Sequence, residues 1–147
     1  MNDRKPVVLF LCSRNSCRSQ MAEGFLREFA GERFRIHSAG LEAADEVHPL
    51  AVRVMKEVGI DISDQQPESL SDYLGEVAVG YAIIVCAAAA QRCPHVWPGL
   101  GRRLEWPFED PVAYEGTEEE RLDKFREVRD KIAHRIRDWL AEMEETG

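Results

Sequence analysis

Long apolar runs are scarce in this chain of 147 residues. The longest one near the start, Val7–Leu11, is far shorter than the ~20 apolar residues that a membrane-spanning helix needs. Residues 1–5 are not followed by the apolar segment or the small-residue cleavage site of a secretory signal. We therefore expect a cytoplasmic protein that has no membrane partner.

Positive charge is also in short supply. The chain has 19 lysine and arginine residues against 27 aspartate and glutamate residues, which gives a net charge of −8 and a pI of about 5.1. Proteins that bind nucleic acids normally carry a basic surface, so we expect no nucleic-acid partner. An anionic substrate would have to be held by a local positive site.

Several sequence signatures are missing as well. The chain has no internal repeat, no linker of biased composition and no Gly-x4-Gly-Lys-Ser/Thr nucleotide motif. Its four cysteines lack the Cys-x2-Cys spacing typical of structural zinc sites. In a reducing cytoplasm, such thiols favour catalysis or metal binding over structural disulfides. The chain is 44% hydrophobic, which suits one core, so we expect residues 1–147 to form a single domain.

The apolar residues that are present predict alternating strands and helices. We expect strands at Val7–Leu11, Phe34–Gly40, Tyr81–Val85 and Leu104–Trp106. We expect helices from about Arg18, over Pro49–Val58, over Ser69–Val79, and from a capping box at Thr117 and Glu120 onward. This alternation predicts an α/β fold with a central four-stranded parallel sheet and helices on both faces. The active site of such a sheet lies at the carboxyl ends of its strands, where Cys12, Cys86 and Asp110 all fall.

The segment Leu9–Gly24, LFLCSRNSCRSQMAEG, places a reactive thiol where a buried strand ends. A loop that runs from a strand into a helix can aim successive backbone amides at one tetrahedral anion, and Arg18 can fork two of its oxygens. The same field would lower the pKa of Cys12 and make it nucleophilic. Ser19 could donate to the sulfur, and Asn15 tolerates the left-handed backbone of a tight loop. The alternative is an ordinary connection with a chance cysteine, but an arginine in a first helical turn is electrostatically unfavourable.

This segment resembles the phosphate loop of low-molecular-weight protein tyrosine phosphatases, and its continuation, Ser19–Gly24, resembles their relatives, the thioredoxin-coupled arsenate reductases. The resemblance extends to about Ile136 through His37–Gly40, Gly59–Ser63, Asp110-Pro111 and Gly116–Glu120. It implies a low-molecular-weight phosphatase-like fold and an oxyanion-binding loop. The loop residues are Ser13, Arg14, Asn15, Ser16, Cys17, Arg18 and Ser19.

The resemblance also implies a thiol relay. Cys12 would attack arsenate, Cys86 would attack Cys12 and release arsenite, and Cys93 would pass the disulfide to thioredoxin. Asp110, held extended by the following proline, would be the general acid. Phosphate or sulfate would bind as analogues of arsenate. We expect a monomer without a tightly bound cofactor, although some relatives bind potassium through positions that match Asn15, Glu23, Ser38 and Glu68.

Other interpretations of the cysteines stay open. A phosphatase that forms a Cys12 phosphoenzyme would need Arg18 and Asp110 but neither Cys86 nor Cys93. A module that senses oxyanions or redox state could use the same thiols without turnover. Cys86 and Cys93 could also be inert core thiols, or zinc ligands together with His95.

Two departures from the family pattern matter here. Ser13-Arg14 stands where Thr-Gly is usual, so Arg14 would be strained if that position needs positive φ. The residues after Cys86 form an alanine run that is a good helix former. Helix over 87–92 would hold Cys86 and Cys93 ~10 Å apart, whereas a disulfide needs Cα atoms within about 7 Å. We therefore expect this segment to unwind when the two cysteines become oxidised.

Overall fold

The computed structural model describes residues 5–94 and 96–146. His95, named above as a candidate zinc ligand, lies outside the described residues. The strands are β1 (Val7–Cys12), β2 (Arg35–Gly40), β3 (Val79–Ile84) and β4 (Leu100–Glu105). The helices are α1 (Arg18–Ala30), α2 (Pro49–Glu57), α3 (Ala87–Arg92) and α4 (Glu118–Thr146), with short 3₁₀ turns η1 (Leu70–Asp72) and η2 (Pro111–Ala113).

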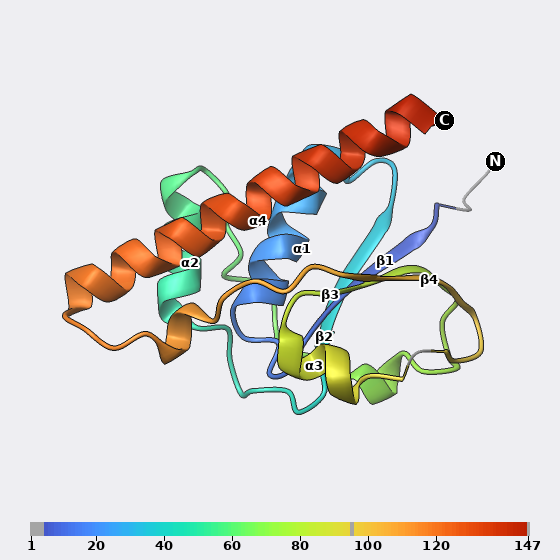
Figure 1. Cartoon of the computed structure of the whole chain (residues 1–147), viewed down its shortest axis with the longest axis horizontal. Helices are drawn as coiled ribbons and strands as arrows, with labels where there is room; N and C mark the ends of the chain where they lie inside the picture. The colour runs from blue at the N-terminus through green and yellow to red at the C-terminus, as the bar shows by residue number, and fades with distance from the viewer. Residues whose placement is uncertain (1–4, 95, 147) are drawn as a thin grey trace.

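The four strands form one parallel sheet in the order β2-β1-β3-β4. Cys12 at the end of β1 pairs with Gly40 of β2, and Leu11 pairs with Ile84 of β3. The carboxyl ends of the strands therefore meet at one edge of the sheet, as Figure 1 shows. The predicted α/β fold with a four-stranded parallel sheet is confirmed.

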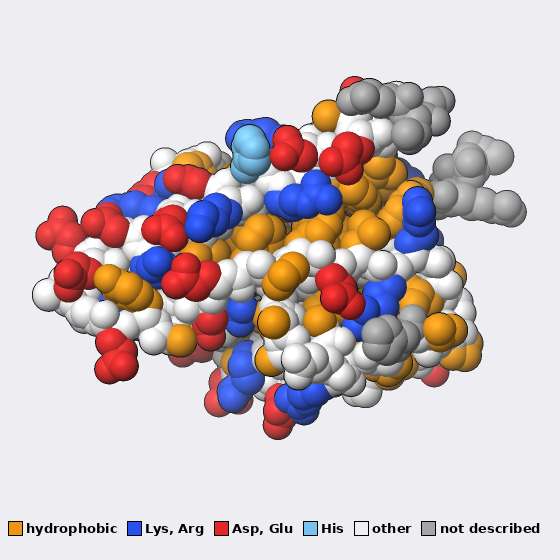
Figure 2. Space-filling view, viewed as in Figure 1, with side chains coloured by type: hydrophobic (Ala, Val, Ile, Leu, Met, Phe, Trp, Pro, Cys, Tyr) orange, Lys and Arg blue, Asp and Glu red, His pale blue; other side chains and the backbone are white. Residues whose placement is uncertain are grey.

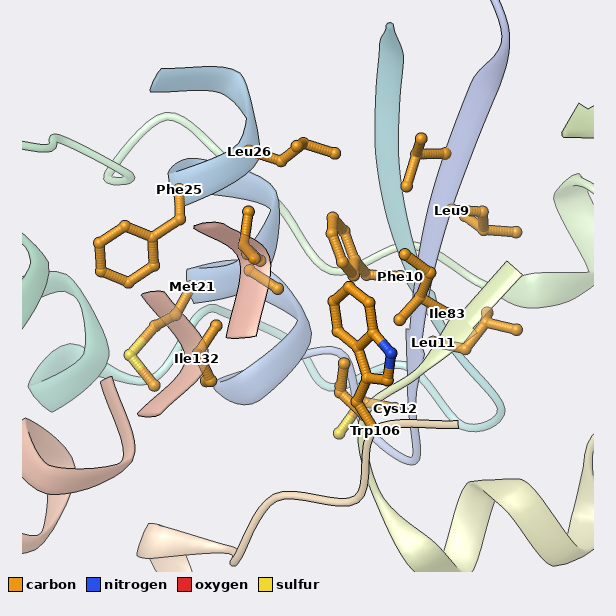
Figure 3. Packing of buried hydrophobic residues seen from close by; sticks show 14 of the residues in the cluster. Leu9, Phe10, Leu11, Cys12, Met21, Phe25, Leu26, Ile83, Trp106 and Ile132 are labelled. Carbon is orange, nitrogen blue, oxygen red and sulfur yellow. The ribbon is translucent and has the colours of Figure 1, made fainter. Parts of the chain in front are cut away.

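Helices cover both faces of the sheet. The long helices α1, α2 and α4 contact one another on one face (Figure 1). Figure 3 shows Phe10 directed toward α1, whereas Leu9 and Leu11 point away from it. The short helix α3 contacts β1 and β3. Along the sheet, the connection from β3 to β4 moves in the direction opposite to the connection from β1 to β2. Because such crossovers are right-handed, the helices that they contain, α3 and α1, lie on opposite faces of the sheet.

Local sequence signals explain where most helices begin and end. The side chain of His48 caps α2 by accepting a hydrogen bond from the amide of Leu50, and Gly59 follows this helix with a positive φ of 83°. At α4, the hydroxyl of Thr117 accepts from the amide of Glu120, whose carboxylate accepts from the amide of Thr117. The predicted capping box is therefore confirmed.

Two predicted elements differ from the structure: one helix is absent, and one strand has other bounds. The segment 69–79 is not a helix, because only η1 is helical and Gly75, with a φ of 76°, reverses the chain before β3 begins at Val79. The fourth strand begins at Leu100, four residues earlier than expected, and excludes Trp106. An edge strand exposes one side to solvent, so β4 carries Gly101 and charged side chains that hide the apolar pattern of a strand.

The surface mixes charges of both signs. On the face shown in Figure 2, acidic and basic side chains alternate along α4, and apolar side chains show between α4 and the strands below it. Within residues 5–94 and 96–146, no helix combines the length and apolar character needed to cross a membrane.

Candidate functional site

The loop between Cys12 and Arg18 curls around a common centre. Four of its carbonyls accept hydrogen bonds from the segment 41–48 at 2.8 to 3.2 Å, and they belong to Cys12, Ser13, Arg14 and Ser16. In a trans peptide the N–H points away from the C=O, so the amides that follow these carbonyls turn toward the cavity. One of them, the amide of Arg14, donates to the sulfur of Cys12. This geometry agrees with the predicted anion cradle.

Buried side chains fix the shape of this loop. Asn15 has a φ of 54°, which is the left-handed conformation that was predicted for it. Its side chain is fully buried. Its amide nitrogen donates to Ser19 Oγ at 2.8 Å, and its oxygen accepts from the amide of Glu68 at 2.8 Å. Gln20 donates to the Asn15 carbonyl at 2.9 Å. Arg14 is an exposed residue without positive φ, so the suspected strain at that position is absent.

Gly40 lets the loop approach the second strand. A Cβ atom at this position would lie 2.9 Å from both the carbonyl carbon of Arg14 and the amide nitrogen of Asn15. Because both atoms belong to the backbone, neither could move without shifting the loop. The only signal of this contact in the sequence is the Ser-Ala-Gly ending of the strand.

Arg18 reaches back over the cavity from the first turn of α1. Its Nη1 donates to the Phe108 carbonyl at 2.9 Å, and its Nη2 lies 3.7 Å from Asp110 Oδ2. Its Nε is buried and has no hydrogen-bond acceptor in the described part of the chain. A buried donor without a partner costs free energy, so this nitrogen is poised for an acceptor that enters the cavity. The contact with the Phe108 carbonyl could not be predicted from the sequence, because every residue has a backbone carbonyl.

Asp110 and Cys86 line the same cavity as the loop. The cavity has a volume of about 430 Å³. Its lining residues are Cys12, Ser13, Arg14, Ser16, Cys17, Arg18, Cys86, Ala87, Ala88, Phe108, Asp110 and Val112. Asp110 is also the N-cap of η2, where its Oδ1 accepts from the amide of Val112 at 2.9 Å. Residues that lie up to about a hundred positions apart therefore share one cavity of the size that small-molecule sites have.

Cys12 and Cys86 share a hydrogen bond inside this cavity. The bond from Cys12, helped by the Ser13 hydroxyl 3.5 Å away and the Ala89 amide, lowers the pKa of Cys86 to about 5. The same bond, together with burial, raises the pKa of Cys12, against the influence of Arg18. Burial and the shared hydrogen bond therefore oppose the predicted lowering of the pKa of Cys12, and the two thiols titrate as a pair that shares one negative charge. The sequence could not show that strand order places the two thiols together.

Cys93 lies at the other end of α3 and is buried. Its amide donates to the Ala89 carbonyl at 2.8 Å, so the expected helix between the two cysteines is confirmed. Burial raises the pKa of Cys93, and the charge of Arg103 opposes that rise. Six helical residues separate Cys86 from Cys93, which keeps the two thiols ~10 Å apart along the axis.

Two other loop residues have scaffold contacts. Cys17 is the N-cap of α1 and is buried beneath the loop, and this burial raises its pKa. Ser19 is fully buried and accepts from Asn15, while the hydroxyl next to a cavity sulfur belongs to Ser13. In place of the expected bond between Ser19 and the nucleophile, the hydroxyl of Ser13 and the sulfur of Cys86 share a hydrogen bond.

The four positions considered for potassium all take part in hydrogen bonds within the protein. Ser38 donates to Glu23 at 2.6 Å, Tyr73 donates to Glu68, and Glu23 also accepts from Arg27 at 2.5 Å. Asn15, the remaining position, has its oxygen occupied as described above. Glu23 and Glu68 also line one polar cavity, and potassium binding stays a prediction. Within the described residues, which exclude His95, no three metal-ligating side chains cluster.

Comparison with known proteins places the chain in a family. Residues 7–147 match the model of the low molecular weight phosphotyrosine protein phosphatase family. An arsenate reductase of Halalkalibacterium halodurans is 45% identical over 133 residues, which cover 90% of this chain and 94% of that protein.

Two solved structures of arsenate reductases share the fold. One, in a phosphate-binding state, has a TM-score of 0.77 and 34% identity and covers 93% of this chain and 98% of its own. The other, the thioredoxin-dependent arsenate reductase of Corynebacterium glutamicum, has a TM-score of 0.76 and 29% identity and covers 100% of this chain and 66% of its own. The chain therefore belongs to the low molecular weight phosphotyrosine protein phosphatase family and, within it, to the arsenate reductases.

Proposed function

We propose that this chain reduces arsenate to arsenite through a relay of Cys12, Cys86 and Cys93 that thioredoxin regenerates. The observation that carries this proposal is the contact of Cys86 with Cys12 inside the oxyanion cavity. A phosphatase needs only one thiol there, whereas reduction of arsenate needs two electrons and hence two thiols. The names of the similar proteins support the same substrate.

Binding of the oxyanion uses the loop and Arg18. The amides that face the cavity and the unpartnered Arg18 Nε supply donors for the oxygens of a tetrahedral anion. The net charge of the chain is −8, so attraction must come from these local groups. In the proposal, binding also favours transfer of the Cys12 proton to the Cys86 thiolate along their hydrogen bond. Cys12 then becomes the nucleophile that the cradle needs.

The chemical steps follow from the order of the thiols. The Cys12 thiolate attacks arsenic, and one arsenic oxygen leaves as water after receiving a proton from Asp110. Cys86 then gives its proton to an oxygen of the arsenic group and attacks the sulfur of Cys12. The sulfur–arsenic bond breaks, its electron pair stays on arsenic, and arsenite leaves. Two electrons have passed from two thiols to arsenic, and a Cys12–Cys86 disulfide remains.

The last steps move the disulfide to the surface. The Cys93 thiolate attacks Cys86, forms the Cys86–Cys93 disulfide and frees Cys12 as a thiolate. This step requires α3 to unwind, because its six residues hold the two sulfurs apart. Thioredoxin then reduces the exposed bond, as the name of the similar Corynebacterium glutamicum protein states for that protein. A cytoplasmic location, where reduced thioredoxin is available, and a monomeric state belong to the same proposal.

A phosphatase activity is the second candidate. Cys12, Arg18 and Asp110 line one cavity and would suffice to form and release a phosphoenzyme. In this alternative Cys86 would not take part in the chemistry. Both reactions could use one cradle, so the cysteine variants must distinguish them.

A coupled assay tests the proposal. Arsenate should cause oxidation of NADPH in the presence of thioredoxin and thioredoxin reductase, and Cys12→Ser, Cys86→Ser and Cys93→Ser should each abolish the turnover. Phosphate is the matched control, because phosphorus cannot be reduced under these conditions. With Cys93→Ser, a single turnover should yield one arsenite per chain and a Cys12–Cys86 disulfide, which mass spectrometry can detect. The proposal fails if the parent does not turn over arsenate while the double variant Cys86→Ser, Cys93→Ser still hydrolyses p-nitrophenyl phosphate.

A further inference from the structure

Arg103 is an unusually buried cation on the edge strand β4. Only 11% of its side chain is exposed, and its Nη2 donates to the carbonyl of Ala90 at 2.7 Å. Its Nη1 pairs with Glu105, and its Nε is buried and lacks an acceptor among residues 5–94 and 96–146. No step of the proposed chemistry uses this arginine. Its best-formed contact outside its own strand is with the last turn of α3.

The contact with Ala90 holds α3, the helix that unwinds in the proposed relay. Besides its own short ladder and an exposed ion pair of Arg92 with Glu42, α3 has two hydrogen bonds near its ends. At its start the sulfur of Cys86 accepts from the Ala89 amide at 3.4 Å, and near its end Arg103 donates to Ala90. A Cys86–Cys93 disulfide cannot form while the helix is intact. Oxidation consumes the sulfur that accepts at the start. At the other end the Arg92–Glu42 pair is exposed and therefore weak, so Arg103 is the buried contact that opposes unwinding.

We propose that Arg103 is a positioning residue for the relay. Arg103 stabilises the helical form of α3, in which Cys86 and Cys93 are reduced, and so raises the reduction potential of the Cys86–Cys93 disulfide enough for thioredoxin to reduce it. This inference rests on the proposed function. A group that stabilises the dithiol and not the disulfide raises the reduction potential of the pair. A charge-assisted hydrogen bond to a helix carbonyl is a contact of that kind, because unwinding moves the carbonyl away.

The equilibrium of the disulfide measures this effect. Cys12→Ser chains, which leave Cys86 and Cys93 as the relay pair, are equilibrated in buffers of reduced and oxidised glutathione and analysed by mass spectrometry. The two thiols lose two electrons and two protons, and glutathione disulfide takes them up. Adding Arg103→Met should shift the equilibrium about tenfold toward the disulfide, which corresponds to a potential ~30 mV lower for a two-electron couple. Amide exchange over 89–93 in the reduced protein should become faster.

Matched variants separate this role from general stability. Arg102 is an exposed arginine on the same strand, and Arg102→Met should leave both the potential and the exchange of α3 unchanged. Arg103→Lys keeps a cation and a donor and should shift the equilibrium about three-fold; if Arg103→Met does not fold, this variant decides. A parent-like potential in the Arg103 variants would overturn the inference while leaving the relay intact. Failure of the Cys86–Cys93 disulfide to form in any chain would instead overturn the proposed function.

Discussion

At the scale of single residues, the site depends on where one proton resides. A thiol and a thiolate in contact stabilise each other, so neither Cys12 nor Cys86 titrates as a free cysteine would. The sequence correctly indicates that the field of the loop favours a sulfur anion. It could not show that Cys86 shares this anion, because the sharing depends on contacts of the Cys86 sulfur with Ser13 and with the amide of Ala89 in α3.

Titration of the thiols tests this assignment. Absorbance at 240 nm should show one thiolate of the Cys12–Cys86 pair forming with a midpoint near pH 5. Cys12→Ser should keep this midpoint low, since a hydroxyl can replace the thiol as donor, whereas Cys12→Ala should raise it because the donor is lost. Burial raises the pKa of both Cys17 and Cys93, which keeps their signals out of this range. A first thiolate in the parent near the ordinary cysteine value of about 8.5 would contradict the assignment.

Gly40 offers a second prediction at the residue scale. Gly40→Ala should push the loop at Arg14 and Asn15 outward, because the new methyl group would lie 2.9 Å from backbone atoms of both. We expect phosphate affinity, measured by calorimetry, to fall about tenfold, or ~1.4 kcal/mol, as the amides lose their common centre. Gly59→Ala is the control: it meets no atom within 4 Å and strains only its own positive φ, so it should lower stability without changing affinity.

At the scale of elements, the sequence predicts best what short-range chemistry determines. The capping box at Thr117, the proline and glycine that bracket α2 and the apolar run of β1 each mark an element from within itself. The segment 69–79 and the start of β4 were predicted wrongly, because tertiary contacts decide them. The strand β4 exists because Val79 to Ile84 of β3 pair with it, and such pairing leaves little trace in the strand's own residues.

Packing of α2 against α4 gives a prediction about pH. Glu57 of α2 accepts hydrogen bonds from Arg126 and Arg129 of α4, and these lower its pKa from 4.5 to about 2. Because the pKa of Glu57 is lower in the folded state than in the unfolded state, its carboxylate stabilises the fold fully at pH values above the unfolded-state pKa. This stabilisation is lost as the pH falls toward 2. Glu57→Gln should reduce the free energy of unfolding at pH 7 by ~1 kcal/mol, a value discounted for solvent screening.

The pH dependence separates this ion pair from other effects of the substitution. The difference between Glu57→Gln and the parent, measured by urea unfolding, should shrink steadily between pH 4.5 and 2. Glu115→Gln changes an exposed carboxylate and should show no such trend. A difference that stays constant over the whole range would mean that Glu57 acts through packing and not through its charge.

At the scale of the whole molecule, the sheet brings distant parts of the chain to one edge. The order β2-β1-β3-β4 makes β1 and β3 neighbours, and this brings Cys86 beside Cys12 and Ser13. Ser13 and Cys86 share a hydrogen bond although they are 73 positions apart in the sequence. Each strand end could be predicted from the sequence, but their order in the sheet could not. The general rule that sites lie at the carboxyl ends of parallel strands was enough to bring Cys12, Cys86 and Asp110 to one edge of the sheet, and all three line the cavity.

The same architecture separates stability from chemistry. Trp139 of α4 packs against Phe34, Tyr81 and Trp106 with ring centroids 5.3 to 5.7 Å apart. It thereby joins the helix layer to β3 and to the residues that precede β2 and follow β4. Trp139→Ala should lower the free energy of unfolding by about 3–5 kcal/mol, a large share of the 5–15 kcal/mol typical of a domain. Trp139 is absent from the described lining of the oxyanion cavity, so phosphate affinity of the folded protein should change less than about twofold.

Urea unfolding and phosphate titration of one preparation test both halves of this prediction. Val96→Ala is the control for stability, because 82% of Val96 is exposed and its loss removes no core packing. A loss of phosphate affinity in Trp139→Ala that matches its loss of stability would show that the cradle depends on the whole core. A stable variant would instead show that the four-ring cluster contributes little. We expect neither of these two results, because the cradle is held by hydrogen bonds among residues 12–20, 40–48 and 66–68 and by the carbonyl of Phe108, none of which involves Trp139.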